Sequence, residues 1–127
     1  MIKSKYIADI VHLLIDADDV ELKIRQQAEL ISDTDYNYTG YGLFVTFTSP
    51  ESIKNYRIEK DDLLLLGVKI NSEESNIDAE AILFFKAGII DYLEIWCNTD
   101  NYPKHDLSNY TLTQAWNDSP GKQLSAE

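Results

Sequence analysis

Cysteine, histidine and glycine are scarce in this chain, and each scarcity argues against a class of protein. Among 127 residues the single cysteine, Cys97, permits no intramolecular disulfide, which is typical of a reducing compartment. The two histidines, His12 and His105, have no strong metal-ligand spacing, and the five glycines are scattered outside any phosphate-binding loop. We therefore expect no enzyme activity, no bound metal and no cofactor.

Long apolar runs are also missing. The first amphipathic stretch, residues 2–15, is interrupted by Asp9 and His12. It is too short to cross a bilayer and too polar for the core of a signal peptide. The sequence therefore predicts a cytoplasmic protein with no membrane partner.

Basic residues are outnumbered two to one by acidic residues. Eleven Lys and Arg face twenty-two Asp and Glu, which gives a formal net charge of −11. Residues 1–63 carry −5 (7 basic, 12 acidic) and residues 64–127 carry −6 (4 basic, 10 acidic), so the acidity belongs to the whole chain. Such a field favours solubility, repels nucleic acid and steers basic proteins toward the surface. We expect a basic protein partner and no nucleic acid.

The hydrophobic periodicity changes along the chain from helical to strand-like. Residues 2–15 predict a helix, and residues 18–28 fit either a helix or a strand. For that second stretch we prefer a helix to Gln27, followed by a strand over residues 29–35. Further runs predict strands at residues 42–48, 63–70, 79–86 and 89–97, with a last strand or turn at 110–116.

This order of elements predicts an α+β fold. The N-terminal helix or helices should pack on one face of an antiparallel sheet of about five to six strands. We expect the run over residues 63–70 (LLLLGVKI) to be buried on both faces at its start. A single domain is expected over residues 1–116, with residues 117–127 a flexible C-terminal tail.

The strand predicted at residues 89–97 (IIDYLEIWC) carries an acid in its most apolar part, Glu94. If residues 86–88 (KAG) form a three-residue hairpin loop, Glu80 lies opposite Glu94. One sheet face then mixes large apolar side chains with two carboxylates: Glu80, Ile82, Phe84, Ile90, Tyr92, Glu94 and Trp96. The other face is more uniformly apolar, which suits it for helix packing.

Three explanations of Glu94 stay open. Glu94 could pair with an internal base, such as Arg25 or Arg57, and only satisfy the fold. A register that differs by one residue would place it in solvent, opposite Ala81. Alternatively, this face receives cationic groups of a partner, because Tyr and Trp beside an unpaired acid are typical of interface hot spots.

Aromatic and acidic residues also mix in residues 33–41 (DTDYNYTGY). Asp33 and Asp35 stand there close to Tyr36 and Tyr38. Aromatic strand ends are common in sheets, but turns rich in Tyr, Gly and Asn also make adaptable recognition loops. We favour recognition.

Three segments resemble a pattern found in small acidic bacterial proteins. They are residues 39–44 (TGYGLF), 81–88 (AILFFKAG) and 93–96 (LEIW), in which a glycine-containing strand precedes an apolar hairpin with a Leu-Glu-aromatic sequence. The pattern is similar to that of immunity proteins of polymorphic toxin systems, including contact-dependent inhibition. The resemblance implies a toxin-binding role and identifies no binding residue, because such families share no single site.

Taken together, these features favour an immunity-type protein that neutralises a toxin domain by stoichiometric occlusion. The cognate toxin is expected to be basic, and a nuclease fits because phosphate-binding surfaces are basic. The predicted partner-binding residues are Asp33, Asp35, Tyr36, Tyr38, Tyr92, Glu94 and Trp96. One alternative is a small-ligand-binding or minor enzymatic domain with a pocket around Glu80, Glu94 and Tyr92. Another is a self-associating structural domain.

Overall fold

The computed structural model describes residues 1–16, 20–99, 101–115 and 121–126. Two α-helices and a 3-10 helix accompany seven strands in this part of the chain: α1 (Lys5–Leu14), α2 (Leu22–Leu30), β1 (Ser32–Tyr38), β2 (Gly42–Thr48), η1 (Glu51–Tyr56), β3 (Leu64–Ser72), β4 (Ile77–Lys86), β5 (Ile89–Cys97), β6 (Tyr110–Gln114) and β7 (Gln123–Ala126). The strands form one antiparallel sheet in the order β1-β2-β5-β4-β3-β6-β7. The predicted α+β class is confirmed.

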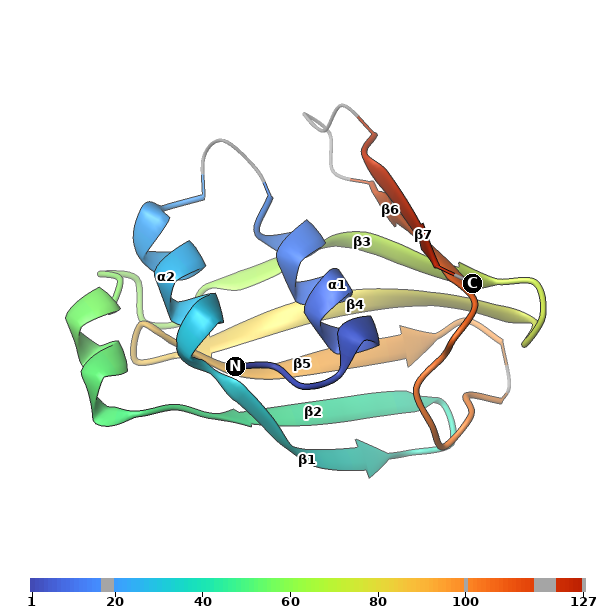
Figure 1. The fold of residues 1–127 in the computed structure, drawn as a ribbon, viewed down its shortest axis with the longest axis horizontal. Coiled ribbons are helices and arrows are strands. Elements are labelled where there is room, and N and C mark those ends of the chain that lie inside the picture. Colours follow the sequence, from blue (N-terminus) through green and yellow to red (C-terminus); the bar gives the residue numbers. More distant parts are fainter. Residues whose placement is uncertain (17–19, 100, 116–120, 127) are drawn as a thin grey trace.

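Both helices lie on the same face of the sheet (Figure 1). Helix α1 begins after Ser4, whose side-chain oxygen accepts a hydrogen bond from Ile7 N–H at 3.1 Å. It contacts β3, β4 and β6, whereas α2 contacts β5 and η1. The core therefore lies between the two helices and this helix-covered face of the sheet. Its α1 members are Tyr6, Ile7, Ile10, Val11, Leu13 and Leu14.

The predicted number of five to six strands is wrong, because the sheet has seven strands and β7 was not predicted. Residues 123–126 were expected within the flexible tail, but they pair with β6 and place Leu124 opposite Leu112. A four-residue strand has too short an alternation to be recognised from sequence. Residues 117–120 and 127 of that predicted tail lie outside the described residues.

The helix and strand boundaries near residue 30 also differ from the prediction. Helix α2 continues past Gln27 to Leu30, and β1 begins at Ser32 rather than at residue 29. The helix continues because Ile24, Gln27 and Ala28 all face the core. Tertiary packing of this helical face outweighs the local strand-like alternation.

Gln27 is the polar link between α2 and the sheet. Its side chain is completely buried, and its Nε2 donates to Tyr56 O at 2.7 Å and to Gly88 O at 2.9 Å. Its Oε1 accepts from Ile90 N–H at 2.8 Å. Gly88 has φ +77°, and a Cβ there would approach Ile58 O to 2.3 Å, so only glycine fits this turn. One side chain thus joins α2, η1 and the β4–β5 hairpin.

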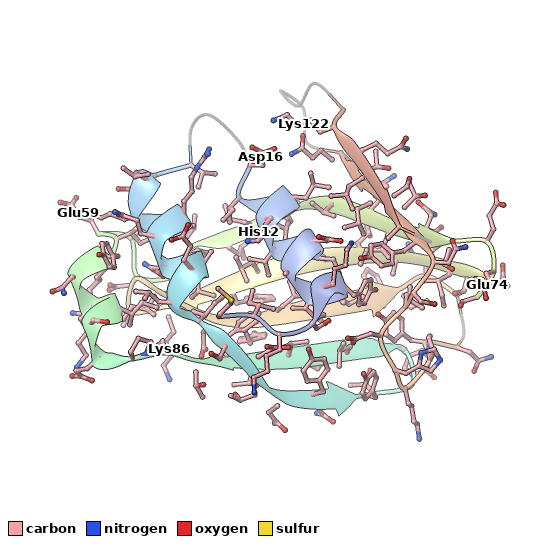
Figure 2. All side chains as sticks on the ribbon, viewed as in Figure 1. His12, Asp16, Glu59, Glu74, Lys86 and Lys122 are labelled. Carbon is pink, nitrogen blue, oxygen red and sulfur yellow. The ribbon has the colours of Figure 1, made fainter. Side chains whose placement is uncertain are left out.

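A second buried glutamine and an ion pair hold the end of α1. Gln114 Nε2 donates to Leu13 O and Asp16 O, both at 3.2 Å, and so adds a donor to two carbonyl groups at the C-terminal end of the helix. Lys122, just before β7, pairs with Asp16 at 2.8 Å (Figure 2). The C-terminal strands therefore stabilise the first helix.

We predict that Gln27→Leu destabilises the protein by about 3 kcal/mol. The substitution leaves the buried Ile90 N–H without its acceptor, removes the donor to the part-buried Tyr56 O, and removes one of two donors to Gly88 O. Urea unfolding followed by circular dichroism measures this change. Gln26→Leu is the matched control, since Gln26 lies on the same helix and is only partly buried. Equal losses in the two variants would contradict the role assigned to Gln27.

Candidate protein-binding site on the open sheet face

The sheet face opposite the helices has no described element packed on it. Its side chains form three rows that run across β3, β4, β5 and β2. The first row is Leu64, Phe84, Tyr92 and Thr46; the second is Leu66, Ile82, Glu94 and Phe44; the third is Lys69, Glu80, Trp96 and Gly42. All of these residues except Gly42 are exposed or partly exposed. We call this surface the open face.

The centre of the open face is aromatic. Phe84 and Tyr92 stack with their ring centroids 4.5 Å apart and an interplanar angle of 10°, and Phe44 approaches Tyr92 at 6.0 Å. Trp96 is 55% exposed, because its neighbour on β2 is Gly42, which has no side chain to cover the ring. A Cβ at Gly42 would lie 1.9 Å from Ile95 O, so the backbone geometry enforces this glycine.

Glu94 lies in the middle row of the open face. Phe44 and Ile82 flank it on the neighbouring strands, and Tyr92 and Trp96 precede and follow it on the same side of β5. The side chain is partly buried. Among the described residues no ion pair involves Glu94. The internal pairing with Arg25 or Arg57 is therefore not found.

The predicted opposition of Glu80 and Glu94 is wrong. Glu80 pairs with Trp96 and Glu94 pairs with Ile82, a register that differs by two residues from the expected one. The hairpin turn consists of Ala87 and Gly88 alone, and the register shifts again between Phe84 and Phe85. Glu80 instead lies across from Lys69 on β3, so the two carboxylates do not face each other.

The expected separation into two faces is largely confirmed. Six of the seven predicted mixed-face residues lie on the open face, whereas the seventh, Ile90, is buried on the helix-covered face. The irregular register beside Phe85 turns Ile90 inward.

The predicted partner-binding residues divide between the two faces of the sheet. Tyr92, Glu94 and Trp96 lie on the open face, and Asp35 joins them at its margin, opposite Thr46. The other three, Asp33, Tyr36 and Tyr38, pair with buried Phe47, Val45 and Leu43 and so point toward the helix side. The structure brings the first group together and separates it from the second.

The carboxylate of Asp33 forms hydrogen bonds inside the folded chain. Its carboxylate accepts hydrogen bonds from Lys3 N–H at 2.7 Å, from Ser4 N–H at 3.2 Å and from the Tyr36 hydroxyl. Partial burial raises the pKa of Asp33, but these hydrogen bonds outweigh it and leave the pKa below its ordinary value. Asp33 therefore anchors the segment before α1.

Sequence reasoning missed several members of the open face. The run that contains Leu64 and Leu66 was expected to be buried on both faces, yet these residues are 45% and 57% exposed. The register shift between Leu66 and Val68 places them on the face opposite the buried Val68 and Ile70. Phe44 was missed because the pairing of β2 with β5 joins segments far apart in the chain. Simple alternation would group these two leucines with the buried Val68 and Ile70, so the signal that could have revealed them is Gly67, because glycine within a strand often marks a bulge.

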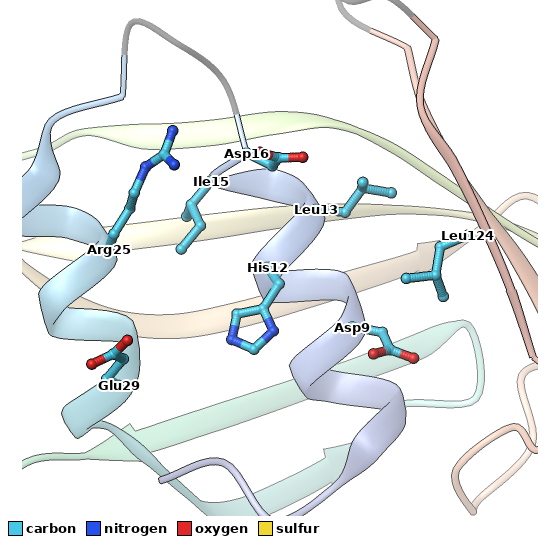
Figure 3. A pocket seen from close by; sticks show the side chains of 8 residues that line it. All are labelled: Asp9, His12, Leu13, Ile15, Asp16, Arg25, Glu29 and Leu124. Atoms are coloured by element: carbon cyan, nitrogen blue, oxygen red, sulfur yellow. The ribbon is translucent and has the colours of Figure 1, made fainter.

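A pocket of about 370 Å³ lies on the other side of the sheet, between α1 and α2 (Figure 3). Side chains of both charges line this open groove: Asp9, His12, Leu13, Ile15, Asp16, Arg25, Glu29 and Leu124. Glu80, Tyr92 and Glu94 do not contribute to it. In the described parts of the chain, no three or more His, Cys, Asp or Glu side chains are grouped to hold a metal ion.

We predict that Asp33→Asn lowers the free energy of unfolding at pH 7 by about 1 kcal/mol, a value reduced for the partial exposure of the site. Because the folded-state pKa of Asp33 lies below the unfolded value, the carboxylate stabilises the fold above the unfolded pKa. That contribution is lost as the pH falls through the folded value. The deficit should therefore shrink at pH 3, as measured by chemical denaturation. Asp35→Asn is the control and should change little at either pH.

Comparison with family models, with curated proteins and with solved structures gives no match to this chain. Within the residues that the structure describes, neither helix has the length and apolar character needed to cross a membrane. Functional argument therefore depends on the side chains of the open face.

Proposed function

We propose that this protein is an immunity-type inhibitor, which binds a basic toxin domain through the open face and blocks it stoichiometrically. The observation that carries the proposal is the position of Glu94, an acid without an ion-pair partner among the described residues, inside a partly exposed aromatic cluster. Exposed apolar side chains on a sheet face that no described element covers are typical of protein-binding surfaces.

The charge of the chain supports a basic partner. With a formal net charge of −11, the protein attracts a cationic domain over a distance of about one Debye length, roughly 8 Å at physiological salt. Contact with the apolar residues of the open face would then slow dissociation. A nuclease domain is the favoured target, because its phosphate-binding surface is basic and is the surface that an inhibitor must cover.

Co-expression with the product of the neighbouring upstream gene tests the proposal. A toxin domain should arrest growth alone, should be tolerated in the presence of this protein, and should be isolated with it as a complex of fixed stoichiometry. The association rate should fall steeply with added salt while the dissociation rate changes little. Failure of any adjacent toxin-like domain to form a complex would contradict the proposal.

We predict that Trp96→Ala weakens the complex at least about tenfold, because exposed Trp side chains at the centre of an interface commonly contribute more than 1 kcal/mol. Biolayer interferometry measures the change. Leu22→Ala is the control, since Leu22 is 69% exposed on α2, on the other side of the molecule. An unchanged affinity of the Trp96 variant would place the interface elsewhere.

The two alternative functions have weaker support. A pocket around Glu80, Glu94 and Tyr92 would need enclosing walls, and these residues lie on an open sheet surface. Self-association through strand addition is disfavoured at both edges, because β1 has an irregular register between Asp33 and Asp35 and β7 has only four residues. Sedimentation at high protein concentration distinguishes a monomer from a self-associating domain.

A further inference from the structure

Four residues of the open face surround Glu94. Glu94 lies at the centre, Phe44 and Ile82 lie on the flanking strands, and Tyr92 and Trp96 lie on the same side of β5. We call this arrangement the Glu94 socket. We propose that the Glu94 socket receives an arginine side chain of the partner protein, an inference that rests on the proposed function but has its own test.

The surroundings of Glu94 leave it without a nearby cation. By strand pairing, the two lysines on the same face are Lys69 and Lys86. Lys69 lies on β3, two strands away from Glu94, and Lys86 lies at the end of the hairpin. Burial among apolar groups already removes part of the hydration of a carboxylate. A cation that binds Glu94 therefore displaces little further water from the carboxylate and forms a charge-assisted hydrogen bond with it.

Glu80 shows how an acid on the same face differs when a cation is close. Glu80 pairs across the strands with Lys69 on one side and with Trp96 on the other. Lys69 is thus the cross-strand neighbour of Glu80, although the two side chains form no salt bridge within the described residues. Glu94 has Ile82 in the corresponding position, so its charge is left for a ligand.

The aromatic walls of the Glu94 socket favour arginine over lysine. A guanidinium is planar, is less strongly hydrated than an ammonium, and can donate two parallel hydrogen bonds to one carboxylate. Its flat face also stacks on aromatic rings. Tyr92 and Trp96 place rings on two sides of Glu94, and Trp96 is uncovered because Gly42 lies beside it.

A second copy of this chain is a poor occupant of the socket. Two chains of net charge −11 repel each other, and the open face of each copy carries more carboxylates than ammonium groups. By strand pairing, the charged strand residues of this face are Asp35, Asp78, Glu80 and Glu94 against Lys69 and Lys86. The charge complementarity points to a cationic protein.

The test uses N-acetyl-L-arginine amide as a probe of the full chain. In ¹⁵N-resolved NMR titrations we expect a dissociation constant on the order of 1 mM. Chemical shifts should change at the Trp96 indole N–H and at the backbone amides of Phe44, Ile82 and Tyr92. N-acetyl-L-lysine amide should bind at least about threefold more weakly. Shifts spread over the acidic surface, or equal affinity for the two amides, would overturn the inference.

Two matched variants locate the site. Glu94→Gln should weaken arginine amide binding at least about tenfold, whereas Glu80→Gln, which removes the same charge from the same face, should keep it within about twofold. The unfolding free energy of Glu94→Gln should equal or exceed that of the native protein, because no internal ion pair is lost. Equal effects of the two substitutions, or a clear loss of stability in Glu94→Gln, would overturn the assignment.

The outcomes separate this inference from the proposed function. If the arginine amide binds as expected but no toxin domain forms a complex, the result supports the Glu94 socket and contradicts the immunity function. If a toxin complex forms and Glu94→Gln leaves the affinity for the toxin unchanged, the result supports the immunity function and contradicts the Glu94 socket. A dimer in sedimentation that Glu94→Gln dissociates would assign the socket to a second copy and overturn the inference.

Discussion

The two short helices of this chain lie on one face of the sheet, and the described structure therefore leaves the opposite face exposed. These helices, of 10 and 9 residues, contact β3, β4, β5 and β6 of the seven-stranded sheet through a nearly continuous apolar layer. The opposite face has no covering layer in the described structure, yet it retains rings and branched aliphatic side chains. Leaving apolar area in water forgoes stabilisation of about 25 cal/mol for each Å². This loss supports the proposal that another molecule covers the open face.

Buried amides hold the covered face together. Gln27 on α2 and Gln114 at the end of β6 each donate to backbone carbonyls of other elements, and Gln27 also accepts a backbone N–H. These hydrogen bonds fix α1 and α2 on the sheet without a buried charge. The acidic residues are therefore not needed in the core. Apart from Asp33 and a few surface pairs, they remain available to shape the field that a partner meets.

The sequence indicates strand positions and faces well and strand partners poorly. Alternation in residues 42–48 and 89–97 predicts both strands, and it correctly separates Leu93 and Ile95 from Glu94 and Trp96. The register of the β4–β5 hairpin depends on a two-residue turn and an irregularity beside Phe85, neither of which alternation encodes. The neighbours of Glu94 depend on the pairing of β2 with β5, which is non-local. Asp33 and Tyr36 look like surface residues in sequence, but the packing of the N-terminal segment on β1 turns them inward.

The strand order has a consequence for how the chain acquires its structure during synthesis. Helix α1 is made first, but it packs on β3, β4 and β6, and β2 gains its second neighbour only when β5 is complete. Until then the N-terminal half can form at most the local β1–β2 hairpin, which is marginal in isolation. Closure of such long loops slows folding relative to helical bundles of equal size. Nascent chains that stop before Ile89 should consequently lack the strand that joins the β1–β2 hairpin to β4, and their incomplete sheet should be open to proteolysis.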